Sequence, residues 1–257
     1  MNRDLGLALF LVLVVAGAGW WLYSQSESEP REQRLPPIEV PTTDSSVPAE
    51  PVYVVPTIND PDYLVDLPAL DDSDGYFQLE LRNLFGRTLD RLLVESGGIE
   101  RFVATIDNLP RKTIAESIRP LKPVAGSILV VDGAITPENA ERYAPYVALF
   151  IQSDLDDLTG AYRRFYPLMQ EAYQRLGYPD AYFNDRVVAV IDHLLETPDV
   201  DGPLMVTRPH VLYEYVDPSL QGLSAGQKVL LRIGAEHRAA VKNRLRELRS
   251  RLTSLDR

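Results

Sequence analysis

The sequence predicts a mainly α-helical domain that follows an N-terminal transmembrane helix and a disordered, acidic linker rich in proline. Three observations lead to this architecture: an uncharged apolar run near the N-terminus, a proline-rich segment after it, and apolar residues spaced three and four apart beyond that. We expect a short tail at 1–4, a membrane anchor at 5–23, the linker at 24–62 and one helical globular domain at 63–257 with one or two short β-hairpins or strands.

The anchor is predicted from the run LGLALFLVLVVAGAGWWLY at 5–23, whose 19 uncharged residues can cross a hydrocarbon core about 30 Å thick. Trp20, Trp21 and Tyr23 fall at its end, where such rings prefer the headgroup region. A cleaved signal peptide is the alternative, because the AGA at 16–18 has the form of a cleavage site. We prefer the anchor, since the apolar run continues past this site.

The linker is predicted from its composition and charge. Eight prolines fall between residues 24 and 61, among many Ser, Thr and Glu, without helical periodicity. Residues 24–80 carry 13 acidic and 2 basic side chains, whereas 81–257 carry 23 of each, so the net charge of −11 belongs to the first of these segments. This acidic balance argues against nucleic acid as a partner.

Helical spacing predicts the main elements of the domain. A first helix runs from 99 to 109 and is closed by Pro110. A second begins at Ser153 as N-cap and ends at Gly177, with a kink expected at Pro167. A third spans about 184–196, and a fourth closes the chain with an apolar stripe that could pack on the domain or form a short coiled coil. That stripe consists of Val241, Leu245, Leu248, Leu252 and Leu255.

Short strands are predicted in two places. The dipeptide Asp132-Gly133 between 128–131 and 134–136 is the signal of a two-residue hairpin. The run 204–207 could form another short strand. These few strands do not change the fold class.

Three motifs have simple structural explanations. Ser224 lies in a G-x-S-x-G pattern without the strand that a nucleophile elbow needs, and with Gln227 it forms a capping box instead. The acidic stretch 71–75 resembles half a calcium loop, but it better suits the first turn of a helix. The three histidines lack a partner at metal-ligand spacing, and there is no cysteine, so we expect no metal and no cofactor.

Tyrosine is unusually frequent, with 13 residues in the chain. Tyrosine combines a large apolar body with a polar tip, which suits grooves that hold peptides or glycans. The segment YPDAYFNDR therefore supplies the candidate binding residues, with the basic C-terminal helix as a second candidate surface. The five residues predicted to border a binding groove are Tyr178, Tyr182, Asn184, Asp185 and Arg186.

Several segments together resemble a known family. They are LPALDDSD, FVATIDNL, NAERYAPYVALF, AYFNDRVVAVIDHLL, RPHVLYEYVDP and LSAGQKVLLRIG. The chain is similar to the bacterial domain-of-unknown-function family DUF3014, single-pass membrane proteins with a proline-rich spacer and one helical domain. The resemblance implies an anchor rather than a cleaved peptide, and supplies no catalytic residue.

The leading functional hypothesis is a binding or scaffold module for a protein or cell-wall partner, anchored in the bacterial inner membrane with its domain on the outer or periplasmic side. A short tail before a span usually stays in the cytoplasm, which gives this orientation. Two alternatives stay open. One is an enzyme that acts on an envelope polymer through Asp185, Asp192 or His193, and the other is a homo-oligomeric scaffold through the stripe at 241–255.

Overall fold

The computed structural model describes residues 50–56, 67–86, 89, 92–94, 96–124, 126–210 and 212–255. The predicted tail at 1–4, the anchor at 5–23 and most of the linker lie outside these residues. Within the described part of the chain, no helix has both the length and the apolar character needed to cross a membrane.

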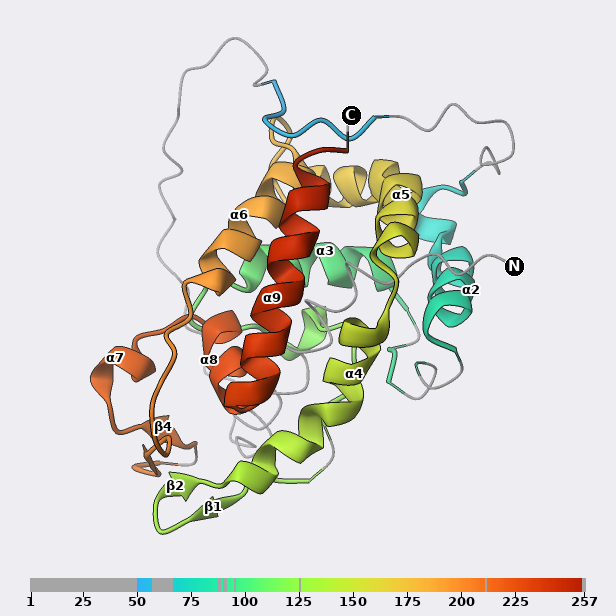
Figure 1. Cartoon of the computed structure of the whole chain (residues 1–257). Coiled ribbons are helices and arrows are strands. Elements are labelled where there is room, and N and C mark those ends of the chain that lie inside the picture. Colours follow the sequence, from blue (N-terminus) through green and yellow to red (C-terminus); the bar gives the residue numbers. More distant parts are fainter. Residues whose placement is uncertain are drawn as a thin grey trace, which may run out of the picture.

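The domain is mainly helical, with two small antiparallel strand pairs, which confirms the predicted fold class for the domain (Figure 1). The first half contains η2 (Leu70–Asp72), α2 (Asp74–Phe85), α3 (Gly98–Asn108), η4 (Glu116–Ile118), β1 (Val130–Val131), β2 (Ala134–Ile135), η5 (Pro137–Tyr143) and α4 (Ala144–Gln152). The second half contains α5 (Leu155–Arg175), α6 (Phe183–Leu195), β3 (Val206–Thr207), β4 (Glu214–Tyr215), α7 (Pro218–Gln221), α8 (Ala225–Arg232) and α9 (Ala235–Leu252).

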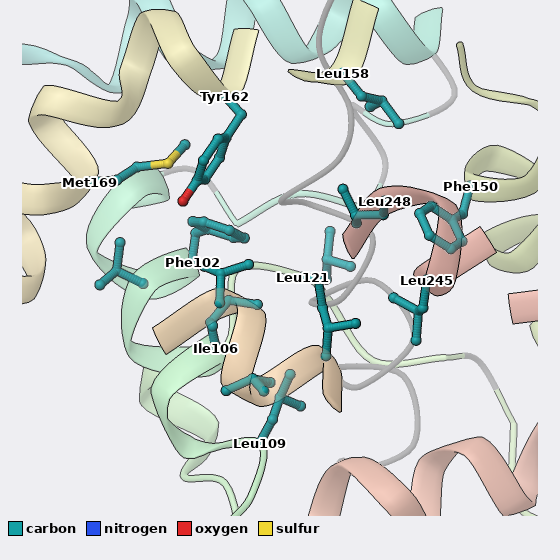
Figure 2. Close-up of a cluster of buried hydrophobic side chains, with 14 of the residues drawn as sticks. Phe102, Ile106, Leu109, Leu121, Phe150, Leu158, Tyr162, Met169, Leu245 and Leu248 are labelled. Atoms are coloured by element: carbon teal, nitrogen blue, oxygen red, sulfur yellow. The ribbon is translucent and has the colours of Figure 1, made fainter. Parts of the chain in front are cut away.

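The C-terminal helix α9 lies across the front of the domain in Figure 1 and packs against α6 and α4. Helix α3 packs against α5 and α6. The core fills the space between these helices, and Figure 2 shows side chains from α3, α5 and α9 directed into it. Phe102 of α3 is fully buried and meets the ring of Phe183 edge-on at 6.0 Å between centroids. Burial of this apolar surface is the main stabilising contribution.

The predicted helices at 99–109 and 184–196 are confirmed as α3 and α6. The predicted start of the second helix was wrong by one residue, because Asp154 is the N-cap of α5. Its carboxylate accepts hydrogen bonds from the backbone N–H groups of Asp156 and Asp157, at 2.7 and 3.2 Å. Ser153 instead donates its hydroxyl to the carbonyl of Phe150 and ends α4.

The apolar stripe of the C-terminal helix faces the core. Val241, Leu245, Leu248 and Leu252 are buried, and Leu255 packs against the same cluster. A coiled coil with a second copy would need this stripe at the surface. The structure therefore removes the proposed oligomer contact through the stripe.

Two of the motifs have local structural roles. Ser224 Oγ accepts a hydrogen bond from Gln227 N at 3.2 Å and Gln227 Oε1 accepts one from Ser224 N at 3.3 Å, which confirms the capping box of α8. The carboxylate of Asp74 accepts the backbone N–H groups of Gly97 and Gly98 at 2.8 and 2.7 Å. It thus holds the start of α3 against α2. Among the described residues, no group of three or more His, Asp or Glu side chains gathers as metal ligands would.

Candidate functional site

The five predicted binding residues lie at the start of α6, and the most buried of them is Asn184. Its Oδ1 accepts a hydrogen bond from Tyr162 Oη at 3.1 Å. Its Nδ2 donates to the carbonyls of Tyr53 and Leu252, at 3.0 and 3.2 Å. Asn184 therefore joins α5, α6, the end of α9 and the segment 50–56, and its amide is used inside the protein.

Asp185, the next residue, holds the segment 50–56 directly. Its two carboxylate oxygens accept the backbone N–H groups of Val52 and Tyr53, at 3.0 and 2.9 Å. The side chains of Tyr53 and Val55 pack against the main core. This part of the predicted linker is thus attached to the domain.

Arg186 and Tyr178 meet at Asp107, a buried acid at the end of α3. Arg186 Nε donates to Asp107 Oδ1 at 2.9 Å, and Tyr178 Oη donates to Asp107 Oδ2 at 3.3 Å. The Tyr178 ring also stacks on Tyr173, at 4.7 Å between centroids. The fifth residue, Tyr182, is half-buried and precedes α6. All five lie at or near the start of α6, but the contacts seen for four of them are with other residues of this same chain, and their binding role stays a prediction.

The residues of the enzymatic alternative contact different elements. Asp192 forms a bidentate ion pair with Arg249 of α9. His193 Nε2 lies 2.8 Å from Ser224 Oγ, the atom that caps α8. Asp185 holds the segment 50–56, as described above. The three side chains therefore contact three different parts of the protein. This arrangement does not favour a joint role for two of them as general acid and general base.

The partial burial of His193 predicts a pH dependence of stability. Burial lowers the pKa of His193 below its ordinary value, with Arg186 adding to this effect and Glu196 opposing it. The folded protein thus binds this proton more weakly than the unfolded chain, so its contribution to stability is complete above about pH 6.5 and declines as the pH falls. Urea unfolding of the full-length chain at pH 7.5 and pH 5.5 should show this decline, and His193→Gln should reduce it. An equal decline in the variant would contradict this assignment.

A second region of the domain carries the more informative surface. The β1–β2 and β3–β4 pairs, together with α7, form what we call the hairpin lobe, residues 128–136, 204–210 and 212–221 (Figure 1). The predicted hairpin is confirmed: Asp132 and Gly133 form its turn with φ of 49° and 76°, and Val131 pairs with Ala134. The predicted strand near 204–207 is also confirmed, as β3.

The two hairpins join into one antiparallel surface. A bridge pairs Ala134 of β2 with Met205, next to β3. Ile135 N donates to the Leu204 carbonyl at 3.0 Å, and Val206 N donates to the Gly133 carbonyl at 2.7 Å. The strands therefore follow one another in space in the order β1, β2, β3, β4.

The register assigns each side chain of the hairpin lobe to one of two faces. Val130 pairs with Ile135, and Val206 pairs with Tyr215. These four side chains form one face, which packs against Leu231 of α8 in a second small core. Burial raises the pKa of Tyr215, and the positive charge of Arg232 opposes this rise.

The opposite face of the hairpin lobe is also apolar, and it is exposed. Alternation along β1 places Leu129 and Val131 on this face. The bridge between Ala134 and Met205 places Met205 on it as well. Val216 lies beside Met205, because its backbone N–H donates to the Met205 carbonyl. Their exposed fractions are 43, 61, 43 and 56%. An antiparallel sheet with one face in the core normally presents polar residues to water on the other. We call these four side chains the apolar face, and such gathered exposure marks interaction sites.

Acidic side chains accompany the apolar face. Glu214 pairs with Thr207 and so shares this face by register. Asp132 lies in the turn beside Val131, and Asp217 directly follows Val216. Asp217 is the N-cap of α7, and hydrogen bonds from the hydroxyl and backbone N–H of Ser219 lower the pKa of its carboxylate below the ordinary value.

A polar cavity of about 800 Å³ lies between the start of α5 and helix α9. Four of its charged side chains form ion pairs: Arg251 pairs with Asp156, and Arg244 pairs with Glu247 at 2.8 Å. The carboxylate of Asp154 caps α5. These charges are largely paired within the protein, whereas Arg244 Nε is buried without a hydrogen-bond partner, and we place the candidate site at the apolar face.

The apolar face was not among the predicted site residues, although the sequence contains its signal. Leu129, Val130 and Val131 form an unbroken apolar run before Asp132-Gly133, which is typical of a strand with apolar residues on both faces. The sequence does not reveal that only one of these faces would be covered.

Comparison with known proteins identifies one family. A family model described as "Protein of unknown function (DUF3014)" matches residues 98–249, which is more than half of the chain and includes the hairpin lobe. No curated protein and no solved structure matches the chain.

Proposed function

Because the chain belongs to the DUF3014 family, whose description states no activity, we propose its function from the apolar face: it is a membrane-anchored binding module for a protein partner. The observation that carries this proposal is the exposure of Leu129, Val131, Met205 and Val216 together on one face of the hairpin lobe. Covering this face removes apolar surface from water, which is the general driving force of protein association.

The partner that fits this face presents an apolar surface with basic side chains beside it. Apolar side chains of the partner would cover Val131 and Val216, while Lys or Arg would approach Glu214 and Asp132. Complementary charge of this kind speeds association and selects among partners more than it adds affinity. The neutral balance of residues 81–257 as a whole makes the local acidity informative.

The membrane anchor predicted at 5–23 belongs to the same proposal. An anchor and a proline-rich linker would hold the module at the inner membrane and let it reach a partner in the envelope space. Attachment of the segment 50–56 to α6 would shorten the free part of the linker. The predicted Tyr-rich residues at the start of α6 would then fix the end of the linker rather than meet the partner.

The test places a photo-cross-linking amino acid at Val131 or Val216 of the full-length chain in its host cells, with Leu79 as the matched control. Leu79 of α2 is exposed to 55%, close to the values of the two test positions. We expect one protein to be cross-linked from both lobe positions and not from Leu79. Equal cross-linking from Leu79, or scattered products only, would contradict the proposal.

The captured partner, once purified, allows a quantitative prediction. Val131→Glu and Val216→Glu should each weaken its binding by about tenfold or more, because each buries a charge in the contact. Leu79→Glu should leave the Kd unchanged. Calorimetry or surface plasmon resonance measures these values, and an unchanged Kd in both lobe variants would show that the apolar face is not the contact.

A further inference from the structure

The hairpin lobe has two edges, and one of them is closed. The strand order β1, β2, β3, β4 makes β1 one outer strand and β4 the other. On the β4 side, the backbone N–H of Tyr215 donates to Gln221 Oε1 at 3.0 Å. Gln221 belongs to α7, and this helix packs against β4. A side chain and a helix thus occupy the edge at which another strand could pair with β4.

The hydrogen bonds of the first hairpin show where the backbone of β1 points. Thr136 N donates to the Leu129 carbonyl at 2.9 Å, which makes these two residues a hydrogen-bonded pair of the antiparallel ladder. Such pairs alternate with pairs that exchange no hydrogen bond, and the next pair, Val130 with Ile135, is of this second kind. Ile135 instead donates its N–H to the Leu204 carbonyl at 3.0 Å, on the side of β3. The N–H and carbonyl of Val130 therefore point away from β2.

The edge of β1 is open in the part of the chain that the structure describes. Among these residues, neither the N–H nor the carbonyl of Val130 has a hydrogen-bond partner. Figure 1 shows β1 at the lower border of the domain, with no labelled helix or strand beyond it. Leu129 and Val131, on either side of Val130, are exposed to 43 and 61%. An outer strand with free backbone groups and apolar neighbours is a template for a further strand.

The charges along this edge favour one kind of strand. Asp132 directly follows β1, and residues 126–136 contain no Lys or Arg. Outer strands are often protected from strand addition by Lys or Pro, and β1 has neither. A second copy of β1 would bring no cation to Asp132. Charge complementarity therefore favours a basic strand from a different protein.

We propose that the partner adds an extended, basic segment to β1 as a further strand of the hairpin lobe, an inference that rests on the function proposed above. In an antiparallel addition, one residue of the partner exchanges two hydrogen bonds with Val130. The residues before and after it lie beside Val131 and Leu129 and are apolar. A Lys or Arg one position further lies near Asp132. The segment is thus apolar at alternate positions and basic next to them.

The test uses a pentapeptide with this pattern, acetyl-Lys-Val-Thr-Val-Lys-amide, and its analogue N-methylated at the threonine. The two peptides carry the same side chains, but the analogue lacks the N–H that would donate to the Val130 carbonyl. NMR titration of the full-length chain, labelled with ¹⁵N at valine, follows the amide of Val131. We expect this resonance to shift with the pentapeptide, and the analogue to bind about tenfold or more weakly. The amide of Val188, buried in α6, should not shift.

Two variants at Val130 separate strand addition from contact with the apolar face. Val130→Pro removes the outward N–H and keeps the hydrogen bonds of the hairpin, which use the residues on either side, and proline is tolerated at such outer positions. Val130→Ala removes the side chain and keeps the N–H. Val130→Pro should bind the pentapeptide about tenfold more weakly than Val130→Ala. If far-UV circular dichroism shows that Val130→Pro does not fold, the comparison of the two peptides decides alone.

The outcomes distinguish this inference from the proposed function. Equal affinity of the two peptides, equal affinity of the two folded variants, or no binding of the pentapeptide would overturn strand addition. The proposed function would still stand if one protein is cross-linked from both Val131 and Val216. Selective binding of the pentapeptide together with scattered cross-links would support the open edge of β1 as a strand site and contradict the proposed function.

Discussion

Replacing Phe102 with alanine is expected to lower the free energy of unfolding of the domain by about 3 to 5 kcal/mol. Phe102 is fully buried at the contact of α3 with α5 and α6, and it lies among the side chains shown in Figure 2. Its removal loses the transfer free energy of the ring and leaves a cavity, and it also ends the edge-on contact with Phe183. This contribution is a large part of the total stability of an ordinary domain.

Urea unfolding of the full-length chain, followed by far-UV circular dichroism, measures this loss. Leu79→Ala is the matched control, because Leu79 is an apolar residue of α2 that is exposed to more than half. Its substitution should change the free energy of unfolding by no more than about 0.5 kcal/mol. Similar losses in the two variants would mean that Phe102 is not in the core.

The second large effect is expected for Asn184→Leu, which should lower the free energy of unfolding by about 3 kcal/mol. Leucine has a similar size but leaves Tyr162 Oη and the Leu252 carbonyl without their partner inside the protein. Each buried polar group that loses its hydrogen bond costs about 1 to 3 kcal/mol. The Tyr53 carbonyl loses its partner as well, so the segment 50–56 should also become easier to release.

Two controls test this interpretation. Asn243→Leu changes an exposed asparagine of α9 that accepts a hydrogen bond from Arg246, and it should be nearly neutral. A double-mutant cycle with Tyr162→Phe isolates the Tyr162 to Asn184 hydrogen bond, because each single change removes one side of it. If the losses in free energy of unfolding of the two single variants simply add in the double variant, the Tyr162 to Asn184 hydrogen bond does not contribute to stability. Limited proteolysis near residue 56 reports release of the segment.

The role of Asn184 shows how the sequence can identify a segment and mistake its use. The cluster of polar and aromatic residues in YPDAYFNDR was interpreted as a binding groove. The structure directs Asn184, Asp185 and Arg186 to groups of this same chain, at Tyr53, Val52 and Asp107. These partners lie between 79 and 133 residues away along the chain. No local pattern contains such pairings.

Much of the fold could be predicted because its signals are local. The spacing of apolar residues predicted the bounds of α3 and α6 to within one residue, since a helix face repeats every 3.6 residues. Asp132-Gly133 gave the hairpin because its turn needs positive φ at both positions. The start of α5 was missed by one residue, since Ser153 and Asp154 are both good caps and only the local backbone chooses between them.

The sequence by itself thus determined the elements, because periodicity, caps and turns depend on neighbours within a few residues. Only the tertiary structure decided which faces those elements bury. The C-terminal stripe at 241–255 is covered by the domain, whereas Val131 and Val216 of the hairpin lobe stay exposed. Which edge of the lobe stays open likewise depends on the pairing of β2 with β3. Burial depends on contacts between segments distant in the chain, and a single sequence does not specify them.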